Sequence, residues 1–275
     1  MVGEGKIWLG RRRTRIAQLG LRRGISVEAI VLHRWPWQEH GLLIDVFSAE
    51  AGRFRCIARS ARSRKSQLRA VLQPFQLIDI DISGRGEVKT LKRADLQQSI
   101  PLTHLALYSG LYVNELLQRL LPSETELPEL FAAYRHTLEL LQRETFVEPV
   151  LRKFELILLE QLGHDFSFWE DAEYGEAIQP QHSYRFVPTL GFVREHGFVR
   201  EHGMSEQQQQ LILSGQEIRQ LADFQQLDLA LLQQLKKLMR LALQPYLGTK
   251  PLQSRALIAA VLEQQANPSK QEADK

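Results

Sequence analysis

The chain has 275 residues, of which 44% are hydrophobic and 24% are charged, and its formal net charge is +3. These proportions are typical of a globular protein with a hydrophobic core, and no apolar run of 18 residues predicts a membrane-spanning helix. Cys56 is the single cysteine, which excludes an intrachain disulfide and a cysteine-rich zinc site. We therefore expect a cytoplasmic protein without a secretory signal.

The charge is distributed unevenly along the chain. Residues 1–100 contain 19 Lys/Arg and 9 Asp/Glu, a net charge of +10, whereas the remainder contains 16 and 23, a net charge of −7. This asymmetry predicts a polyanionic partner for the N-terminal part. The alternative is a charged surface that only faces solvent.

Residues 1–26 show little periodicity and predict a basic, disordered N-terminal extension. Residues 27–99 contain five short segments rich in Val, Ile, Leu and Phe, separated by turn signals at 35–37, 51–52 and 84–86. The segments are 27–33, 41–48, 53–60, 72–83 and 86–96. Five short strands in so few residues predict a small β-barrel that is closed or nearly closed.

After Pro101 the apolar residues recur at helical spacing, which predicts a mainly α-helical domain over residues 100–265 and hence an α+β protein. Residues 164–204 interrupt it with an irregular or hairpin insertion, in which Phe-Val-Arg-Glu-His-Gly occurs twice in succession, at 192–197 and 198–203. Two copies are too few for a solenoid, so we interpret the duplication as an extension of a hairpin. Residues 266–275 predict a disordered tail.

No motif in the sequence requires catalysis. There is no Walker A sequence and no G-x-S-x-G elbow, and His196 and His202 lie too far apart for a helical metal pair. Asp79 and Asp81 share one face of a predicted strand, which is more simply its solvent face than a cation site. We expect no enzyme, no cofactor and no bound metal; a metal-dependent nuclease is kept as a rival hypothesis.

A cluster of seven cations without an acid lies between Gly52 and Ala70. Such a surface binds a phosphate backbone with release of counterions, and small barrels are common platforms for single strands. Trp35 and Trp37 are predicted on the first inter-strand turn, where their rings could stack on bases or cover the barrel end. The predicted nucleic-acid-binding residues are Arg53, Arg55, Arg59, Arg62, Arg64, Lys65, Arg69, Trp37 and Lys89. Charge alone does not choose between DNA and RNA, so an RNA-binding barrel protein remains the alternative.

Several stretches together resemble the RecO family of bacterial DNA repair proteins. They include EAIVLHRWPWQEHGLLIDVFSAEAGRFRCIARSARSRKSQLRAVLQPF, GRGEVKTLKRAD, LYSGLYVNELLQRLLP, LRKFELILLEQLGH and LALQPYLGTKPLQSRALI. The resemblance implies an oligonucleotide-binding (OB) barrel followed by a helical region. It also implies a non-enzymatic recombination mediator of the RecF pathway, nucleoid-associated, which binds single- and double-stranded DNA and anneals strands coated with the single-stranded DNA-binding protein SSB. RecR would be its partner in loading RecA.

The chain departs from the family pattern in two places. Many members carry four zinc-binding cysteines after the Leu-Gly helix end, where this chain has FSFWEDAEYGEAI without cysteine, so zinc is not expected. The first 26 residues also have no counterpart in the family.

The resemblance implies a second site, because the SSB tail is acidic and ends in an apolar residue. A receptor for it needs an apolar pocket with cations at its rim. The segment LRKFELILLEQL predicts this receptor at Arg152, Lys153, Phe154 and Leu158. The alternative is an ordinary core helix with two solvated cations.

Overall fold

The computed structural model describes residues 25–84, 86–195, 211–224 and 227–266. Most of the predicted N-terminal extension, most of the predicted tail and the two histidines of the duplicated segment lie outside these residues. The chain divides into two compact units, one within residues 1–102 and 114–132 and the other within 103–113 and 133–275.

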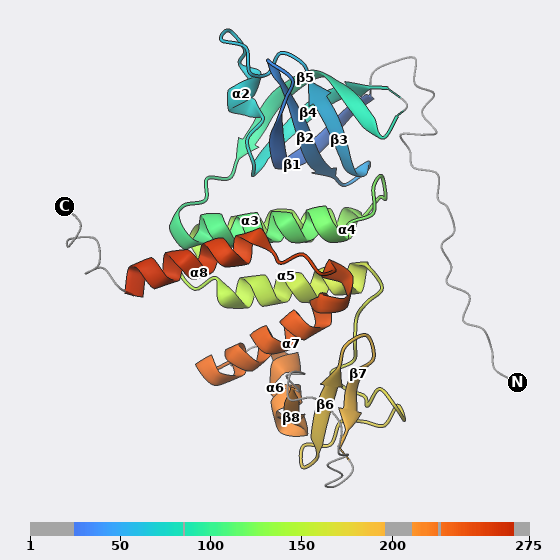
Figure 1. The fold of residues 1–275 in the computed structure, drawn as a ribbon. Coiled ribbons are helices and arrows are strands. Elements are labelled where there is room, and N and C mark those ends of the chain that lie inside the picture. Colours follow the sequence, from blue (N-terminus) through green and yellow to red (C-terminus); the bar gives the residue numbers. More distant parts are fainter. Residues whose placement is uncertain (1–24, 85, 196–210, 225–226, 267–275) are drawn as a thin grey trace, which may run out of the picture. The chain divides into compact units, whose positions relative to one another are not determined.

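The first unit contains a closed five-stranded barrel with the strand order β1-β2-β3-β5-β4 (Figure 1). All neighbouring pairs are antiparallel except β3 and β5, which pair in parallel over only three residues on each strand. The strands are β1 (Ile25–Trp37), β2 (Gly41–Ser48), β3 (Gly52–Ala58), β4 (Gln76–Ser83) and β5 (Val88–Ser99), and the short helix α2 (Leu68–Val71) precedes β4. The predicted five-stranded barrel is confirmed, and it is closed.

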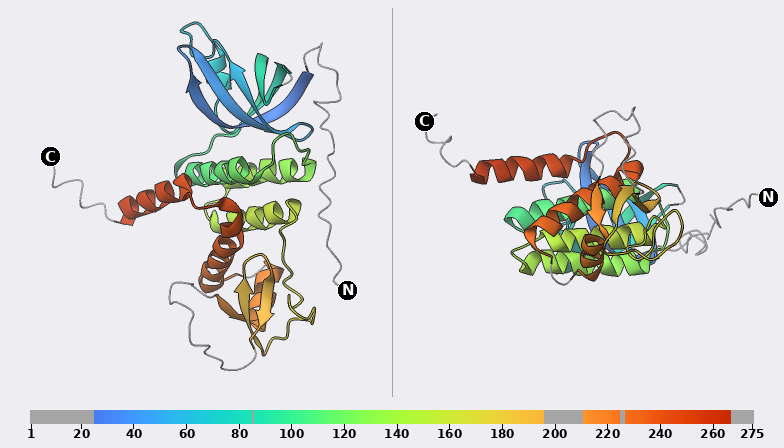
Figure 2. Two further views of the ribbon diagram at one scale, coloured as in Figure 1. Left: turned by 45° about the vertical axis from the view of Figure 1, so that its right-hand side comes forward. Right: turned by 90° about the horizontal axis from the view of Figure 1, so that it is seen from below.

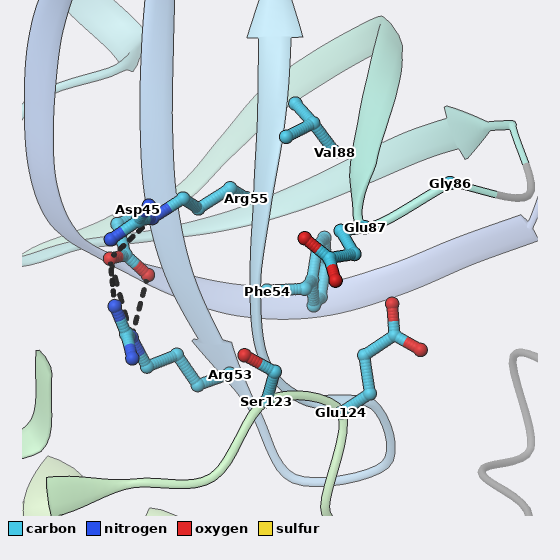
Figure 3. Close-up of a pocket in the computed structure, with 9 residues that line it drawn as sticks. All are labelled: Asp45, Arg53, Phe54, Arg55, Gly86, Glu87, Val88, Ser123 and Glu124. Carbon is cyan, nitrogen blue, oxygen red and sulfur yellow. Dashed lines mark hydrogen bonds and ion pairs between the residues drawn. The ribbon is translucent and has the colours of Figure 1, made fainter.

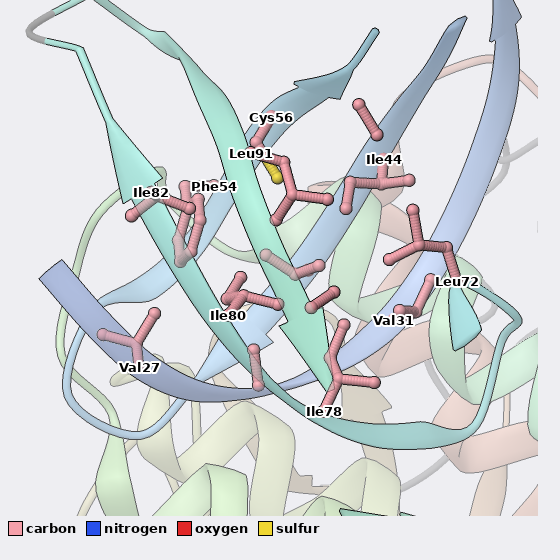
Figure 4. Close-up of a cluster of buried hydrophobic side chains, with 14 of the residues drawn as sticks. Val27, Val31, Ile44, Phe54, Cys56, Leu72, Ile78, Ile80, Ile82 and Leu91 are labelled. Carbon is pink, nitrogen blue, oxygen red and sulfur yellow. The ribbon is translucent and has the colours of Figure 1, made fainter. Parts of the chain in front are cut away.

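The barrel encloses one apolar core because alternate residues of each strand point inward (Figure 4). In β4 the inward positions Ile78, Ile80 and Ile82 are buried, while Asp79 and Asp81 between them are partly exposed. Cys56 is fully buried in the same core, and burial raises the pKa of its thiol. It therefore behaves as a small apolar side chain.

The first strand is longer than the sequence predicts. The expected turn at residues 35–37 belongs to β1, where Trp35 pairs with Leu43 and Trp37 pairs with Gly41. The chain reverses at residues 38–40 instead, and Gln38 takes a positive φ of 50°. Proline at position 36 suggested a turn, but a strand tolerates it where no ladder hydrogen bond from its nitrogen is needed.

The segment between helix α3 (His104–Leu120) and helix α4 (Pro128–Arg143) lies beside β3. The backbone N–H of Glu124 donates to the carbonyl oxygen of Arg53 over 2.8 Å, and a Cβ at Gly52 would overlap the backbone of Thr125. Gly52 also has a φ of +65°, so both its conformation and its surroundings require glycine.

The second unit is mainly helical (Figures 1 and 2), which confirms the predicted helical region. The helices are α3 (His104–Leu120), α4 (Pro128–Arg143), α5 (Glu148–Gln161), α6 (Gly215–Asp223), α7 (Leu229–Leu247) and α8 (Gln253–Ala266), with α3 and α4 each shared between the two units. Pro149 lies in the first turn of α5, as expected. None of the described helices is long and apolar enough to cross a membrane.

The predicted insertion contributes two strands to a small three-stranded sheet of order β7-β6-β8, and the third strand, β8, follows the insertion in the chain. The strands of the sheet are β6 (Ser183–Val187), β7 (Gly191–Arg194) and β8 (Ile212–Ser214). Asp171, which is 4% exposed, accepts backbone N–H bonds from Glu173, Tyr174 and Arg194 and so ties the preceding loop to β7. The Asp171 carboxylate thus holds together the loop in which many family members have zinc-binding cysteines and this chain has none.

Candidate nucleic-acid interface

The outward face of β1, β2 and β3 carries two rows of side chains set by the strand register. In each row, every residue lies opposite the next on the neighbouring strand. The rows are His33, Asp45 and Arg55, and then Trp35, Leu43 and Ile57. One row is therefore polar and charged, and the other is aromatic and aliphatic.

Arg55 and Trp35 join the two rows. The guanidinium of Arg55 lies 5.6 Å from the centre of the Trp35 ring, and its side chain is 48% exposed. The His33 ring lies on the same tryptophan, with 4.3 Å between ring centres, and burial lowers the pKa of His33, which favours its uncharged form. An aromatic ring beside an accessible cation is the arrangement on which bases stack and phosphates bind.

Within the polar row, Asp45 is covered by its neighbours, fully buried, and binds Arg53 (Figure 3). Arg53 Nη2 lies 2.7 Å from Asp45 Oδ2 and Arg53 Nε lies 3.0 Å from Oδ1, while Arg55 Nε is more distant at 3.5 Å. The Arg53 side chain is 11% exposed. Arg53 and Arg55 therefore differ in accessibility although they are two residues apart on one strand. Arg53 is bound within the barrel, whereas Arg55 faces solvent.

Lys89 is also held within the protein. It is 3% exposed, pairs with Glu124 and donates to the carbonyl oxygen of Gly86 over 2.8 Å. A polar pocket of about 410 Å³ lies beside β3 and includes Arg55, Val88 and Glu124 in its lining. Of the nine predicted nucleic-acid-binding residues, Arg53 and Lys89 are thus nearly buried and paired with protein carboxylates, whereas Arg55 pairs with Asp45 at 3.5 Å and stays half exposed.

The other predicted cations lie on an exposed loop and short helix after β3. Arg59, Arg62, Arg64, Lys65 and Arg69 are all exposed. The buried Ala61 holds the loop against the barrel, and the backbone N–H of residue 62 donates to the carbonyl oxygen of residue 40 over 2.8 Å. We call these five cations the basic loop.

The structure brings the basic loop to the β1–β2 turn. Arg62 Nη1 lies 3.5 Å from the carbonyl oxygen of Gln38, next to Trp37, which is 39% exposed. Sequence reasoning did not include Arg34, which donates to the carbonyl oxygen of Arg69 over 3.3 Å. Burial and the neighbouring Arg69 lower the pKa of Arg34. Strand alternation places Arg34 on the face opposite to Trp35 and Trp37, so the sequence pattern gave no signal for this contact.

The acidic residues of β4 have protein partners. Asp79 accepts a hydrogen bond from Ser26, and Asp81 pairs with Arg93. Within the described residues, no group of three or more His, Cys, Asp or Glu side chains could hold a metal ion. The candidate histidine pair at 196 and 202 lies outside them.

On α5 the four predicted partner-binding residues point in different directions. Phe154 and Leu158 are 1% and 0% exposed and belong to the core, whereas Lys153 is exposed. Arg152 lines a pocket of about 360 Å³ in the helical unit. Phe154 and Leu158 are not among the residues that line this pocket beside α5, so their role in partner binding stays a prediction.

This pocket has an apolar wall and a cationic rim. Leu105, Phe146, Val147, Leu151 and Ile258 contribute apolar side chains. Cations come from three helices, as Arg152 of α5, Lys236 and Arg240 of α7, and Arg255 of α8. The sequence could not bring them together, since α5 and α8 are far apart along the chain.

A closed barrel of this strand order, with aromatic and cationic side chains on its outer face, defines the class of OB-type barrel proteins, here joined to a helical region. The chain belongs to the RecO family. The family models for the N-terminal and C-terminal parts of recombination protein O match residues 23–100 and 103–256.

Similar proteins carry the same family name. DNA repair protein RecO of Enterobacter sp. (strain 638) is 41% identical over 231 residues, covering 83% of this chain and 94% of that protein. The one of Sodalis glossinidius is 42% identical over 243 residues, covering 88% and 90%. The Escherichia coli O139:H28 protein is 42% identical over 231 residues, covering 83% and 91%. Family membership supports a role in DNA repair and recombination.

Proposed function

We propose that this chain is a non-enzymatic recombination mediator that binds single- and double-stranded DNA and anneals complementary strands coated with SSB. With RecR it promotes the loading of RecA, as a cytoplasmic, nucleoid-associated protein of the RecF pathway. The observation that carries the proposal is the outer face of the barrel, where Arg55 lies over Trp35 beside the basic loop.

The two parts of this surface would bind different parts of DNA. The five exposed cations of the basic loop attract phosphates of either one or two strands, because counterion release depends on charge and not on sequence. Trp35 and Trp37 offer ring faces to unpaired bases. A protein that binds backbone and unpaired bases without sequence readout can bring two complementary strands together.

An annealing assay tests the proposal. Complementary oligonucleotides coated with SSB should form duplex faster with this protein than without it, and the double variant Arg62→Glu/Arg64→Glu should lose this activity. The matched control is Arg143→Glu/Lys237→Glu, which makes the same charge change at exposed positions of the helical unit. Equal annealing by the two double variants would contradict the assignment of the basic loop.

The rival hypotheses have their own measurements. An RNA-binding barrel would bind an RNA oligonucleotide more tightly than DNA of the same sequence and would not accelerate DNA annealing. A nuclease would shorten labelled DNA during incubation with Mg²⁺. We expect preference for DNA and intact substrate.

The pocket beside Arg152 is the proposed receptor for the acidic SSB tail. Its apolar wall around Leu151 would take the terminal apolar residue, and its rim cations would face the acids. Lys153, Phe154 and Leu158 do not line it, so the proposal now depends on Arg152. Arg152→Glu should abolish binding of a fluorescent tail peptide and leave binding of naked DNA within about twofold, since distant sites act independently. Lys153→Glu is the control, because that side chain is exposed and outside the pocket.

A further inference from the structure

The helical unit contains a buried carboxylate that does not line the proposed partner-binding pocket. Glu155 of α5 is 0% exposed. Its Oε1 accepts a hydrogen bond from the Tyr112 hydroxyl over 2.6 Å and pairs with Arg152 Nη2 at 3.0 Å. Burial raises the pKa of Glu155 and of Tyr112. A buried ion pair contributes less to stability than apolar residues of similar volume often do, so stability alone explains its presence poorly.

Tyr112 extends this contact to a second cation. Its hydroxyl oxygen accepts a hydrogen bond from Arg255 Nη2 over 3.1 Å, and the same guanidinium lies 5.4 Å from the centre of the tyrosine ring. One Glu–Tyr pair therefore contacts two guanidinium groups, one from α5 and one from α8.

Arg152, Arg255 and Tyr112 all line the 360 Å³ pocket, whereas Glu155 does not. Arg152 Nε is buried and makes no hydrogen bond among the described residues; the nearest carboxylate oxygen, on Glu148, lies 3.8 Å away. Glu148 also binds Lys236 at 2.6 Å. Among the described residues the buried Nε–H group of Arg152 therefore has no acceptor, which departs from the usual pairing of buried polar groups.

We propose that Glu155 and Tyr112 are positioning residues that hold the guanidinium groups of Arg152 and Arg255 in place for a carboxylate of the bound acidic peptide. This inference rests on the proposed receptor role of the pocket. Holding the donors before binding reduces the entropy lost when the peptide binds. Positioning by Glu155 favours peptide binding, whereas the negative charge of Glu155 repels an acidic ligand and so disfavours binding.

The opposition of these effects makes two substitutions informative. Tyr112→Phe removes the shared hydroxyl without changing charge, and Glu155→Gln removes the charge that holds Arg152. If positioning dominates, each variant binds an acidic peptide with an apolar C-terminus about fivefold to tenfold more weakly, the loss of about one hydrogen bond. If net charge dominates, Glu155→Gln binds it more tightly.

Control variants separate positioning from general destabilisation. Tyr134→Phe alters another fully buried tyrosine of the helical unit, and Glu139→Gln alters an acid paired with Arg135 on α4. Both should bind the peptide within about twofold of the unsubstituted protein. In an Arg255→Met background, Tyr112→Phe should lose most of its effect, because the residue through which it acts is gone.

A measurement without peptide tests the positioning itself. In the full chain labelled with ¹⁵N-arginine, the guanidinium groups of Arg152 and Arg255 should rotate slowly, Glu155→Gln should free Arg152, and Tyr112→Phe should free Arg255. Rapid rotation in the unsubstituted protein, or unchanged or tighter peptide binding by both variants, would overturn the inference. Slow rotation without any peptide binding would instead refute the receptor role, and the inference that rests on it.

Discussion

Reversing four cations of the basic loop provides the most direct quantitative test of the interface. In the variant with Arg59, Arg62, Arg64 and Lys65 all changed to Glu, the barrel should stay folded because these side chains are exposed and the loop is held by backbone contacts. Single-stranded DNA should bind far more weakly, since up to four phosphate contacts are lost. The assay is fluorescence anisotropy of a labelled oligonucleotide at several salt concentrations.

The magnitude follows from counterion release. Each phosphate contact to a single strand contributes about 0.7 to the slope of log K against log salt, so four contacts contribute roughly 3. At about 0.1 M salt this corresponds to a loss of affinity of several hundredfold, before repulsion by the new acids is counted. A single Arg62→Ala change should lower the slope by about 0.7 and the affinity by about fivefold.

Arg53→Met is the contrasting variant. Its guanidinium is bound to Asp45 and is 11% exposed, so its removal should leave the salt slope unchanged. A fourfold-reversed variant that is folded and keeps the original slope would refute the role of the basic loop. A fall in slope for Arg53→Met would show that the Asp45 pair opens on binding.

Three further predictions concern the barrel and the insertion. Asp45→Asn should destabilise the β2–β3 region by about 3 kcal/mol, because it leaves the mostly buried Arg53 without its counter-charge. Amide hydrogen exchange in these strands that stays at the original rate would contradict this. Cys56 should resist alkylation at pH 8 until the protein unfolds, since burial raises the pKa of its thiol and the thiolate is not formed; rapid labelling of the folded protein would show otherwise. Protein purified without an affinity tag should contain no stoichiometric zinc by elemental analysis. The reason is that Asp171 and its backbone donors hold the loop that four cysteines organise in other members of the family. One tightly held zinc ion per chain would contradict this prediction.

The barrel could be predicted from the sequence because its information is local. The alternation of apolar residues such as Ile78, Ile80 and Ile82 with polar residues indicates which face of a strand is buried. This pattern can be seen without knowledge of the rest of the fold. The end of β1 was predicted less well. Proline at position 36 is a strong turn signal, yet pairing with β2 continues to Trp37, and only the partner strand determines that outcome.

The site residues required information that no local pattern carries. Arg53 and Arg55 have the same strand parity, and the β2–β3 register places Asp45 opposite Arg55, yet its carboxylate contacts Arg53 more closely. On α5, helical spacing identified apolar residues without stating which of them face the core. Leu151 lines the pocket and Phe154 does not, and much of the lining comes from α3, α7 and α8, which are distant from α5 along the chain.

The attachment of the basic loop has an evolutionary consequence. The loop is fixed by a backbone hydrogen bond from residue 62 to residue 40 and by the small buried side chain of Ala61. The charged side chains of the loop contribute little to its attachment. Substitutions that remove an arginine or lysine at one position and introduce one at a neighbouring position would therefore leave the barrel intact. Selection would then act on the total charge of the loop more strongly than on any single residue. Descendants could exchange individual cations freely while keeping a similar attraction for phosphates.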